Sequence, residues 1–388
     1  MSIRLAKRIS DSGEYLFAEL DKRKKEAIER SIDVVDLGIG DPDLPTPDHV
    51  MERLQQAVQD PSNHKYPSYE GKATLRKSIA EYMSRRFDVS LDPDHEIVVL
   101  IGSKEGIAHL SWALLDPGDV ALVCDPAYPV YECSARFCGA DVHRLPLKRE
   151  NGFLPDLSSI PPDVARKAKV LWLNYPNNPT AGTATRGFFE EAVRFCRENE
   201  IVIINDASYA EIYLDGNPPV GLLEIEGGRE IGLEFHSFSK TFNMTGWRIG
   251  WAAGNKTIIE GLGRIKTNVD SGVFGAVQDA AAAALSGPWT TVEEIRETYA
   301  RRRDILCSGL KEAGWDVLIP KATFFVLAAV PPGMKGMDAA AGLLNEAGIA
   351  CTPTAGMGPG GEGFVRFSLT APDERIREAA RRLKALGG

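Results

Sequence analysis

The middle of this chain carries the pattern that most constrains its fold. Between about residues 96 and 254, short apolar runs alternate with amphipathic stretches, and such runs are typical of strands buried on both faces. The predicted strands are 96–101, 120–124, 170–174, 201–205, 234–238 and 248–253. The alternation therefore predicts an α/β fold in which a mostly parallel sheet lies between helices.

The pattern changes toward the end of the chain. A helix is predicted at 72–87, and a long helix at 293–311 is expected to leave the sheet and link two domains. Beyond it lie predicted strands at 315–319, 323–330, 349–352 and 364–369 and predicted helices at 337–346 and 373–386. We interpret this part as a smaller α+β unit. The expected division is a large domain of residues 46–285 and a small domain of residues 1–45 and 286–388.

Composition excludes several classes of partner. The 388 residues carry a net charge of −9, without the basic stripe that nucleic acids or anionic membranes require. No stretch approaches the roughly 20 apolar residues of a membrane span, and no signal peptide is recognised at the start, so a cytoplasmic protein is expected. The six cysteines show no C-x-x-C spacing and the histidines no metal-ligand spacing, so we expect neither disulfides nor a metal.

Lys240 lies in the most informative segment, residues 237–250, which reads SFSKTFNMTGWRIG between two predicted strands. Ser237, Ser239 and Arg248 place donors for a phosphate dianion beside the lysine amine. Taken alone, a lysine in a loop is usually a solvated side chain. The whole segment, however, resembles the lysine segment of the class I/II aminotransferases, which depend on pyridoxal 5'-phosphate (PLP). The resemblance implies that Lys240 bonds covalently to PLP and acts as the catalytic base.

Two residues follow the predicted strand 201–205. Asp206 stands where a strand end can carry a carboxylate to a ligand, and the resemblance implies that it pairs with the pyridine nitrogen of PLP. Tyr209 is implied to bond the hydroxyl of the ring. Without the lysine segment, Asp206 as a helix cap and Tyr209 as a packing residue would be equally good interpretations.

Three further cofactor contacts are implied by shorter motifs. Ser103 and Lys104 lie in GSKEG (102–106), which resembles the family's phosphate cup at a helix N-terminus. Tyr128, in DPAYPVY (125–131), matches the aromatic residue that stacks on the ring. Their simpler interpretations are a helix cap and a core tyrosine.

The substrate side of the site is also implied by resemblance. Asn178, in the asparagine-proline loop NYPNNPT, is implied to reach both the ring oxygen and the substrate carboxylate, although Ala181 stands where many relatives carry glycine. Arg366 lies in the apolar strand FVRFSL, where a guanidinium suits a planar carboxylate. The backbone at Gly40, in LGIGDPD, is implied to approach the same carboxylate. The alternative interpretation is that the loops at Asn178 and Gly40 are ordinary turns without a role in binding.

Tyr66, in HKYPSYEG (64–71), matches a tyrosine that reaches the cofactor phosphate of the neighbouring subunit, so a homodimer with shared active sites is expected. The matches run in order across residues 37–370, nearly the whole chain. Neither a P-loop nor a G-x-S-x-G motif occurs, which excludes kinase and hydrolase interpretations.

The resemblance implies amino acids and 2-oxo acids as substrates, but the specific donor is harder to predict. The segments at Gly13 to Phe17 and at Tyr66 to Gly71 resemble those of LL-diaminopimelate aminotransferases, and Tyr15 is expected to contribute to the substrate pocket. Aspartate, alanine and aromatic aminotransferases share the other motifs and remain alternatives. So does a carbon–sulfur β-lyase, because the fold does not decide between these reactions. A PLP-sensing regulator is disfavoured, since only about 36 residues precede the Gly38 loop.

Overall fold

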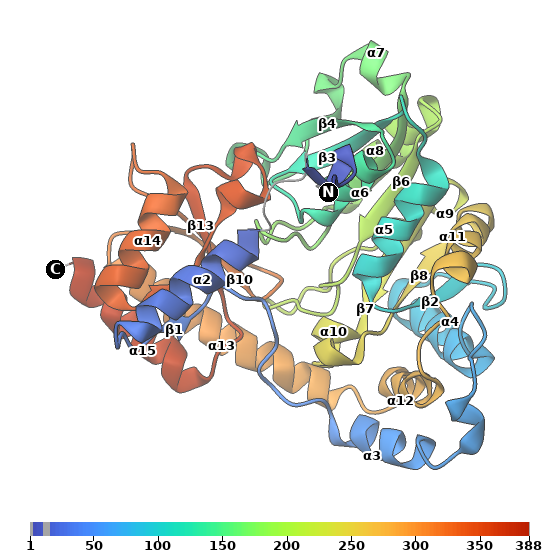
Figure 1. Cartoon of the computed structure of the whole chain (residues 1–388), viewed down its shortest axis with the longest axis horizontal. Helices are drawn as coiled ribbons and strands as arrows, with labels where there is room; N and C mark the ends of the chain where they lie inside the picture. Colours follow the sequence, from blue (N-terminus) through green and yellow to red (C-terminus); the bar gives the residue numbers. More distant parts are fainter. Residues whose placement is uncertain (1–2, 11–15, 388) are drawn as a thin grey trace.

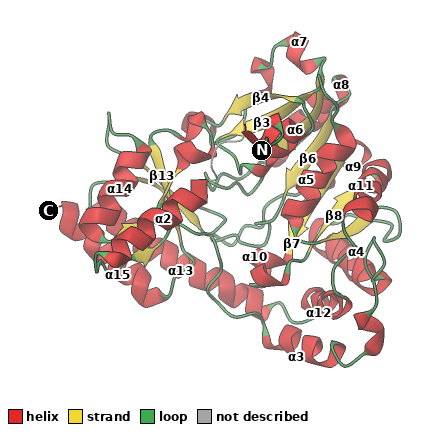
Figure 2. Ribbon diagram, viewed as in Figure 1, coloured by secondary structure: helices red, strands yellow, loops and turns green. Residues whose placement is uncertain are grey.

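The computed structural model describes residues 3–10 and 16–387. Its centre is a seven-stranded sheet with the order β2-β8-β7-β6-β5-β3-β4. The strands are β2 (Ile97–Leu100), β3 (Val120–Asp125), β4 (Asp141–Pro146), β5 (Ala168–Leu173), β6 (Val202–Asp206), β7 (Gly232–Ser237) and β8 (Gly250–Gly254). Strands β4, β3, β5, β6 and β7 are parallel, whereas β8 runs antiparallel to both of its neighbours. Helices cover both faces of this sheet (Figure 2), which confirms the predicted architecture.

Six of these strands lie within two residues of the predicted positions, because their apolar runs are buried on both faces. Strand β4 was not predicted. It pairs only with β3 at the sheet edge, and its sequence DVHRLP leaves most side chains partly or fully exposed. An edge strand needs no continuous apolar run, so this element carried no signal in the hydrophobic pattern.

Helices on the sheet form two apolar cores with it. Helices α5 (Ser103–Leu114), α6 (Val130–Phe137), α8 (Arg186–Glu198) and α11 (Lys256–Val269) contribute to the larger core. Helices α4 (Ala73–Phe87) and α12 (Gly275–Ser286) pack over β2 and β8 in a second core. Near these two helices, α3 (Asp48–Ala57) lies beside α12 (Figure 1). No described helix is long and apolar enough to cross a membrane.

The C-terminal part is an α+β unit, as predicted. Its antiparallel sheet has the order β12-β13-β10-β9, formed by β9 (Asp316–Leu318), β10 (Phe325–Ala329), β12 (Thr352–Pro353) and β13 (Phe364–Ser368). Helices α13 (Thr290–Glu312), α14 (Gly336–Ala347) and α15 (Asp373–Gly387) cover it. Strand β1 (Val35–Asp36), which follows helix α2 (Leu16–Glu29), pairs with β11 (Ile349–Ala350). Helix α2 and strand β1 therefore lie against the C-terminal unit (Figure 1).

Candidate active site

One pocket collects nearly all of the residues that the sequence singled out. It lies at the carboxyl ends of β6 and β7, which is where open α/β sheets bind ligands. The predicted residues that line it are Gly40, Ser103, Lys104, Tyr128, Asn178, Asp206, Tyr209, Ser237, Ser239, Lys240, Arg248 and Arg366. Residues more than 300 positions apart in the sequence thus meet around one cavity.

Two predicted residues are not among the described residues that line this pocket. Tyr66 lies in an open loop with 89% of its side chain exposed, and it lines no part of the cavity within its own chain. Tyr15 lies outside the described residues. The predicted role of Tyr66 lies in the site of a neighbouring subunit, and its absence from the pocket of its own chain is compatible with that prediction.

Lys240 is held at the bottom of the pocket by a short helix. Helix α10 (Phe238–Thr241) starts directly after β7, and the Ser237 hydroxyl caps it by accepting a hydrogen bond from the Ser239 amide. The Lys240 ammonium donates to the carbonyl of Gly40 at 3.0 Å. Burial lowers the pKa of Lys240 to about 8, and the positive charge of Arg248 acts in the same direction. A lysine tuned this way is available as a nucleophile or base near neutral pH.

An anion-binding cradle lies between the start of α5 and Arg248. Gly102 adopts a φ of +80°, and a Cβ built on it would lie 2.5 Å from Nη2 of Arg248. Only glycine therefore lets the guanidinium rest against the turn that opens the helix. Ser103, the first residue of α5, lines the same corner of the pocket. Unpaired amides at a helix start together with a guanidinium form a site for a phosphate dianion.

Asp206, at the end of β6, is almost completely buried. Burial raises the pKa of this carboxyl, and hydrogen bonds from Ser208 and Tyr131 act against that rise. The hydroxyl of Ser208 donates to Oδ1 at 2.6 Å, and the hydroxyl of Tyr131 donates to Oδ2 at 2.8 Å. The carboxylate is therefore a fixed acceptor that faces the pocket.

Arg366, on β13, closes the opposite side of the pocket and is 1% exposed. Its Nη1 donates to Oδ1 of Asn178 at 2.6 Å, and its Nη2 donates to the carbonyl of Gly38 at 2.8 Å. Since Asn178 Oδ1 accepts from the arginine, its amide donors are left for a ligand. The guanidinium also lies 4.0 Å from the ring centre of Phe325, which fixes its plane. Such a pair suits a planar carboxylate.

The loop that carries Asn178 explains one departure from the family pattern. Asn177 holds the loop by accepting hydrogen bonds from the amide and the hydroxyl of Thr180. Ala181 adopts a φ of +58°, a left-handed conformation that costs a non-glycine residue roughly 1–2 kcal/mol. The chain thus keeps at Ala181 the backbone shape that glycine would adopt more easily, and Asn178 is presented to the pocket.

Aromatic side chains form the walls. The Lys104 ammonium lies 5.4 Å from the ring centre of Tyr128, at the entrance of the pocket. Tyr209 is buried edge-to-face against Phe324 and Phe325, with ring centres 5.4 Å and 5.6 Å apart. An aromatic heterocycle can stack on such a wall with its polar edge toward Asp206.

Sequence reasoning missed several residues of the pocket. Tyr131, Asn174 and Ser208 line it, and the amide of Asn174 donates to the carbonyl of Asp206 at 2.7 Å. Tyr131 stands three residues after Tyr128 in the same motif, at the start of helix α6. The motif was therefore a signal for Tyr131, whereas no pattern in the sequence marked Ser208.

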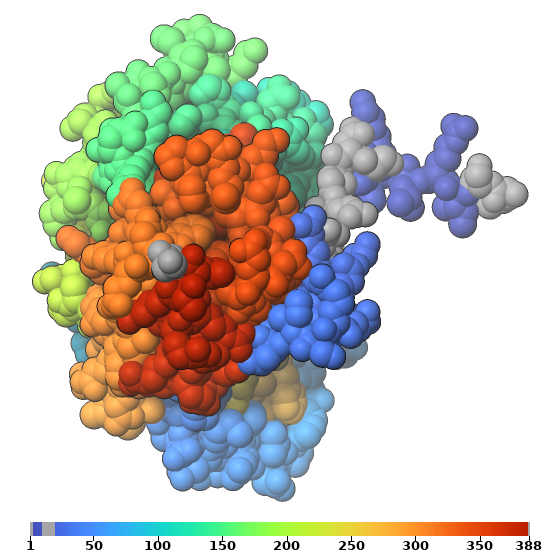
Figure 3. Space-filling view, turned by 90° about the vertical axis from the view of Figure 1, so that its left-hand side faces the viewer, coloured from blue at the N-terminus to red at the C-terminus, as the bar shows by residue number. Residues whose placement is uncertain are grey.

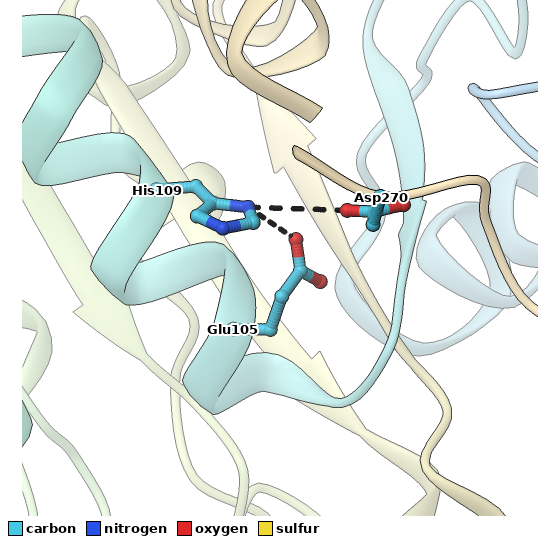
Figure 4. A group of neighbouring side chains, drawn as sticks. All are labelled: Glu105, His109 and Asp270. Atoms are coloured by element: carbon cyan, nitrogen blue, oxygen red, sulfur yellow. Dashed lines mark ion pairs between the residues drawn. The ribbon is translucent and has the colours of Figure 1, made fainter. Parts of the chain in front are cut away.

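An ionic cluster of Glu105, His109 and Asp270 lies beneath the phosphate corner (Figure 4). His109 Nδ1 is 2.6 Å from Glu105 Oε1, and the fully buried ammonium of Lys266 donates to Glu105 at 3.1 Å and to Asp270 at 3.0 Å. Because the buried Lys266 already bonds both carboxylates, we interpret the cluster as an ion-pair network. The second Glu105 oxygen accepts from the amide of Ile101, so the network fixes the turn that precedes Ser103.

Comparisons with known proteins agree with this geometry. The family model described as "Aminotransferase class I and II" matches residues 32–383. An LL-diaminopimelate aminotransferase of Aquifex aeolicus (strain VF5) is 51% identical over 372 residues, which covers 96% of each chain. Substrate-bound BacF from Bacillus subtilis superposes with a TM-score of 0.95 at 36% identity, covering 100% of this chain and 98% of the other. Thermus thermophilus aspartate aminotransferase with maleate gives 0.91 at 30% identity, covering 99% and 100%.

The site and the fold together define a class of protein. A lysine of lowered pKa, an anion cradle, a buried carboxylate and an aromatic wall fit the aldehyde, phosphate, ring nitrogen and ring faces of PLP. The architecture is that of the fold-type I PLP-dependent transferases. Within that class, the chain belongs to the class I and II aminotransferases. It is a PLP-dependent aminotransferase that acts on amino acids and 2-oxo acids.

Proposed function

We propose that this enzyme is an LL-diaminopimelate aminotransferase, which converts LL-diaminopimelate and 2-oxoglutarate into tetrahydrodipicolinate, L-glutamate and water in lysine biosynthesis. The observation that carries this proposal is sequence identity to proteins of that name from Aquifex aeolicus and Desulforudis audaxviator. The present chain is identical to each of them at about half of the aligned positions, and each alignment covers almost the full length of both partners. The aspartate aminotransferase of Thermus thermophilus is only 30% identical. That difference favours diaminopimelate over aspartate as the donor.

The cofactor residues are assigned as part of the same proposal. When bound, PLP supplies an aldehyde and a cationic ring that withdraws electrons from the substrate's α-carbon. Its phosphate is assigned to Ser103, Lys104, Ser237, Ser239 and Arg248. Its ring is assigned to Tyr128, Asn178, Asp206 and Tyr209. Asp206 keeps the ring nitrogen protonated, because a buried carboxylate favours a cation beside it.

Lys240 has two roles in this proposal. It bonds covalently to the cofactor at rest, and its freed amine then removes the proton from the α-carbon of the amino acid. A pKa of about 8 suits both roles, because a base is most effective when its pKa lies near the working pH. The hydrogen bond from Nζ to the Gly40 carbonyl keeps the amine over the pocket when it carries a proton.

Substrate binding is assigned to the other wall. Arg366 and Asn178 hold the α-carboxylate, the backbone at Gly40 lies beside it, and Tyr15 contributes to the side-chain pocket. With the carboxylate clamped, the Cα–H bond has a fixed direction toward Lys240, and such positioning lowers the activation barrier. The same clamp accepts the 2-oxo acid in the reverse half of the reaction, because the two acids share this carboxylate.

We also propose a homodimer whose active sites are completed by Tyr66 of the neighbouring subunit. In support, Tyr66, Tyr69 and Phe274 are exposed, and residues 3–10 extend away from the body of the chain (Figure 3) with Ile3 82% exposed. Such apolar surface indicates a protein partner. The large domain is proposed to span residues 46–285, with residues 1–45 and 286–388 forming the small one, in a cytoplasmic enzyme.

Replacement of Tyr66 by phenylalanine tests the shared site. We expect the dissociation constant of PLP to rise about 10-fold to 100-fold, because a hydrogen bond to a charged phosphate contributes about 1.5–3 kcal/mol. Equilibrium dialysis of PLP measures this constant, with Tyr69→Phe from the same loop as the control. Unchanged PLP affinity in Tyr66→Phe, or a stable and fully active monomer, would contradict the shared site.

The experiment that tests the function supplies one amino acid at a time to the PLP-loaded enzyme without any keto acid. L-glutamate should yield 2-oxoglutarate in a single turnover, and LL-diaminopimelate should react in this half-reaction with a higher second-order rate constant than L-aspartate, L-alanine or L-phenylalanine. Pyruvate and ammonia from cystathionine would instead indicate a β-lyase. Faster turnover of aspartate than of LL-diaminopimelate would overturn the assigned donor while leaving the aminotransferase class intact.

A further inference from the structure

A buried tyrosine to which the sequence analysis assigned no role is bonded to the proposed ring-nitrogen partner. The Tyr131 hydroxyl donates to Asp206 Oδ2 at 2.8 Å, and both residues are at least 94% buried. The Tyr131 ring stacks on Trp172 with centres 5.5 Å apart and planes inclined by 22°. Trp172 stacks in turn on Phe235. Since these rings are packed in the core beneath the sheet edge, the phenol oxygen has little freedom to move.

The hydrogen bonds to Asp206 can be counted against its lone pairs. A carboxylate offers about four acceptor positions, two on each oxygen. Among the described residues, Oδ1 accepts both the amide and the hydroxyl of Ser208, at 3.1 Å and 2.6 Å. Oδ2 accepts only the hydroxyl of Tyr131. One acceptor position on Oδ2 is therefore left, and the carboxyl lines the pocket.

The protonation states are consistent with that count. Burial raises the pKa of Asp206, and the bonds from Ser208 and Tyr131 favour the ionised form. Burial also raises the pKa of the Tyr131 phenol well above its usual range, so the phenol keeps its proton and can only donate to the carboxylate. A neutral donor stabilises the buried negative charge without cancelling it, which leaves that charge for a ligand.

We propose that Tyr131, together with Ser208, is a positioning residue that holds Asp206 ionised and turned so that its last free acceptor position meets the ring N–H of PLP. The inference rests on the proposed assignment of Asp206 to the ring nitrogen. It adds that Tyr131 and Ser208 set the strength of the contact between Asp206 and the ring nitrogen through their hydrogen bonds to the carboxylate. Neither residue needs to touch the cofactor.

The test compares Tyr131→Phe with a matched control. Tyr82→Phe is suitable, because Tyr82 is equally buried and donates to the buried carboxylate of Glu211 at 2.7 Å, away from the active site. Both variants remove one hydroxyl that bonds a buried acid. Any loss of stability caused by removing such a hydroxyl should occur in both variants, and the melting temperature of each variant measures it.

Each protein is titrated with PLP and with 1-deaza-pyridoxal phosphate, in which a carbon replaces the ring nitrogen. We expect the wild-type enzyme to bind PLP more tightly than the analogue. Tyr131→Phe should weaken PLP binding about tenfold or more and weaken binding of the analogue less than about threefold. Tyr82→Phe should change neither by more than about threefold. Ser208→Ala should show the pattern of Tyr131→Phe, which keeps the test usable if Tyr131→Phe does not fold.

Each other outcome has a definite meaning. Equal weakening of both ligands in Tyr131→Phe, or no weakening, would overturn the inference, since the tyrosine would then act only on the fold or not at all. Equal binding of both ligands by the wild-type enzyme would instead remove the assignment of Asp206 to the ring nitrogen, and the inference with it. The first result leaves the proposed cofactor assignment standing and the second does not, so the two failures are distinguishable.

Discussion

Lys240→Ala is expected to lower kcat by at least about 10³-fold, the largest effect of any single substitution in this enzyme. Two described lysines, Lys104 and Lys240, line the pocket, and Lys240 is the one that donates to the carbonyl of Gly40 and has a pKa lowered by burial. Its removal takes away both the covalent bond to PLP and the base. General-base catalysis alone contributes about 10²–10⁴-fold, and loss of the covalent step adds to that.

The measurement is the single-turnover rate of 2-oxoglutarate formation from L-glutamate, with PLP binding and melting temperature recorded in parallel. Added methylamine should restore part of the rate in Lys240→Ala, because a small amine can enter the space of the missing side chain and act as the base. It should not accelerate the wild-type enzyme. Appreciable activity of Lys240→Ala without any added amine would refute the proposed role.

Arg366→Lys should lower kcat/KM for amino acids about 30-fold or more and leave PLP affinity within about threefold. The substitution keeps the charge but loses the planar fork that bonds Asn178 and Gly38, and the two cations are not interchangeable at such a site. Loss of one partner of a buried charge pair costs about 2–5 kcal/mol, and each 1.36 kcal/mol corresponds to a factor of ten in rate.

The control for Arg366→Lys is Arg302→Lys. Arg302 is equally buried and forms a fork with the carboxylate of Asp43, but it does not line the pocket. It should lower the melting temperature while changing kcat/KM less than about threefold. If Arg366→Lys lost PLP affinity as strongly as it lost kcat/KM, or kept the wild-type kcat/KM, the carboxylate assignment would be wrong.

Most of the fold could be predicted because its strands are long enough and apolar enough to be recognised singly. Strand β5 consists of AKVLWL, of which only Lys169 is exposed, whereas the edge strand β4 left no comparable pattern. Register and strand order could not be predicted, since they depend on pairings between distant segments. For example, no local sequence pattern indicated that β8 lies between β2 and β7 and runs antiparallel to both.

The candidate site could be predicted where a residue belongs to a recognised motif, and only there. Lys240 and Arg366 were singled out and meet in one pocket, although their roles remain proposals. Ser208 was not, because a serine two residues after Asp206 is indistinguishable from any turn residue until its hydroxyl is seen on the carboxylate. Tyr66 is a different case, because its predicted role lies in the active site of a neighbouring subunit and depends on how two chains associate.

The two walls of the pocket have different origins in the chain. The acid and base that serve the cofactor belong to the large sheet, with Asp206 at the end of β6 and Lys240 just after β7, whereas Arg366 lies on β13 and Gly40 on the segment beside it. Substitutions before residue 45 and after residue 320 can therefore alter one wall of the pocket while Asp206 and Lys240 stay in place. Duplicated genes could diverge in their acid preference through substitutions before residue 45 and after residue 320 while inheriting a working catalyst unchanged.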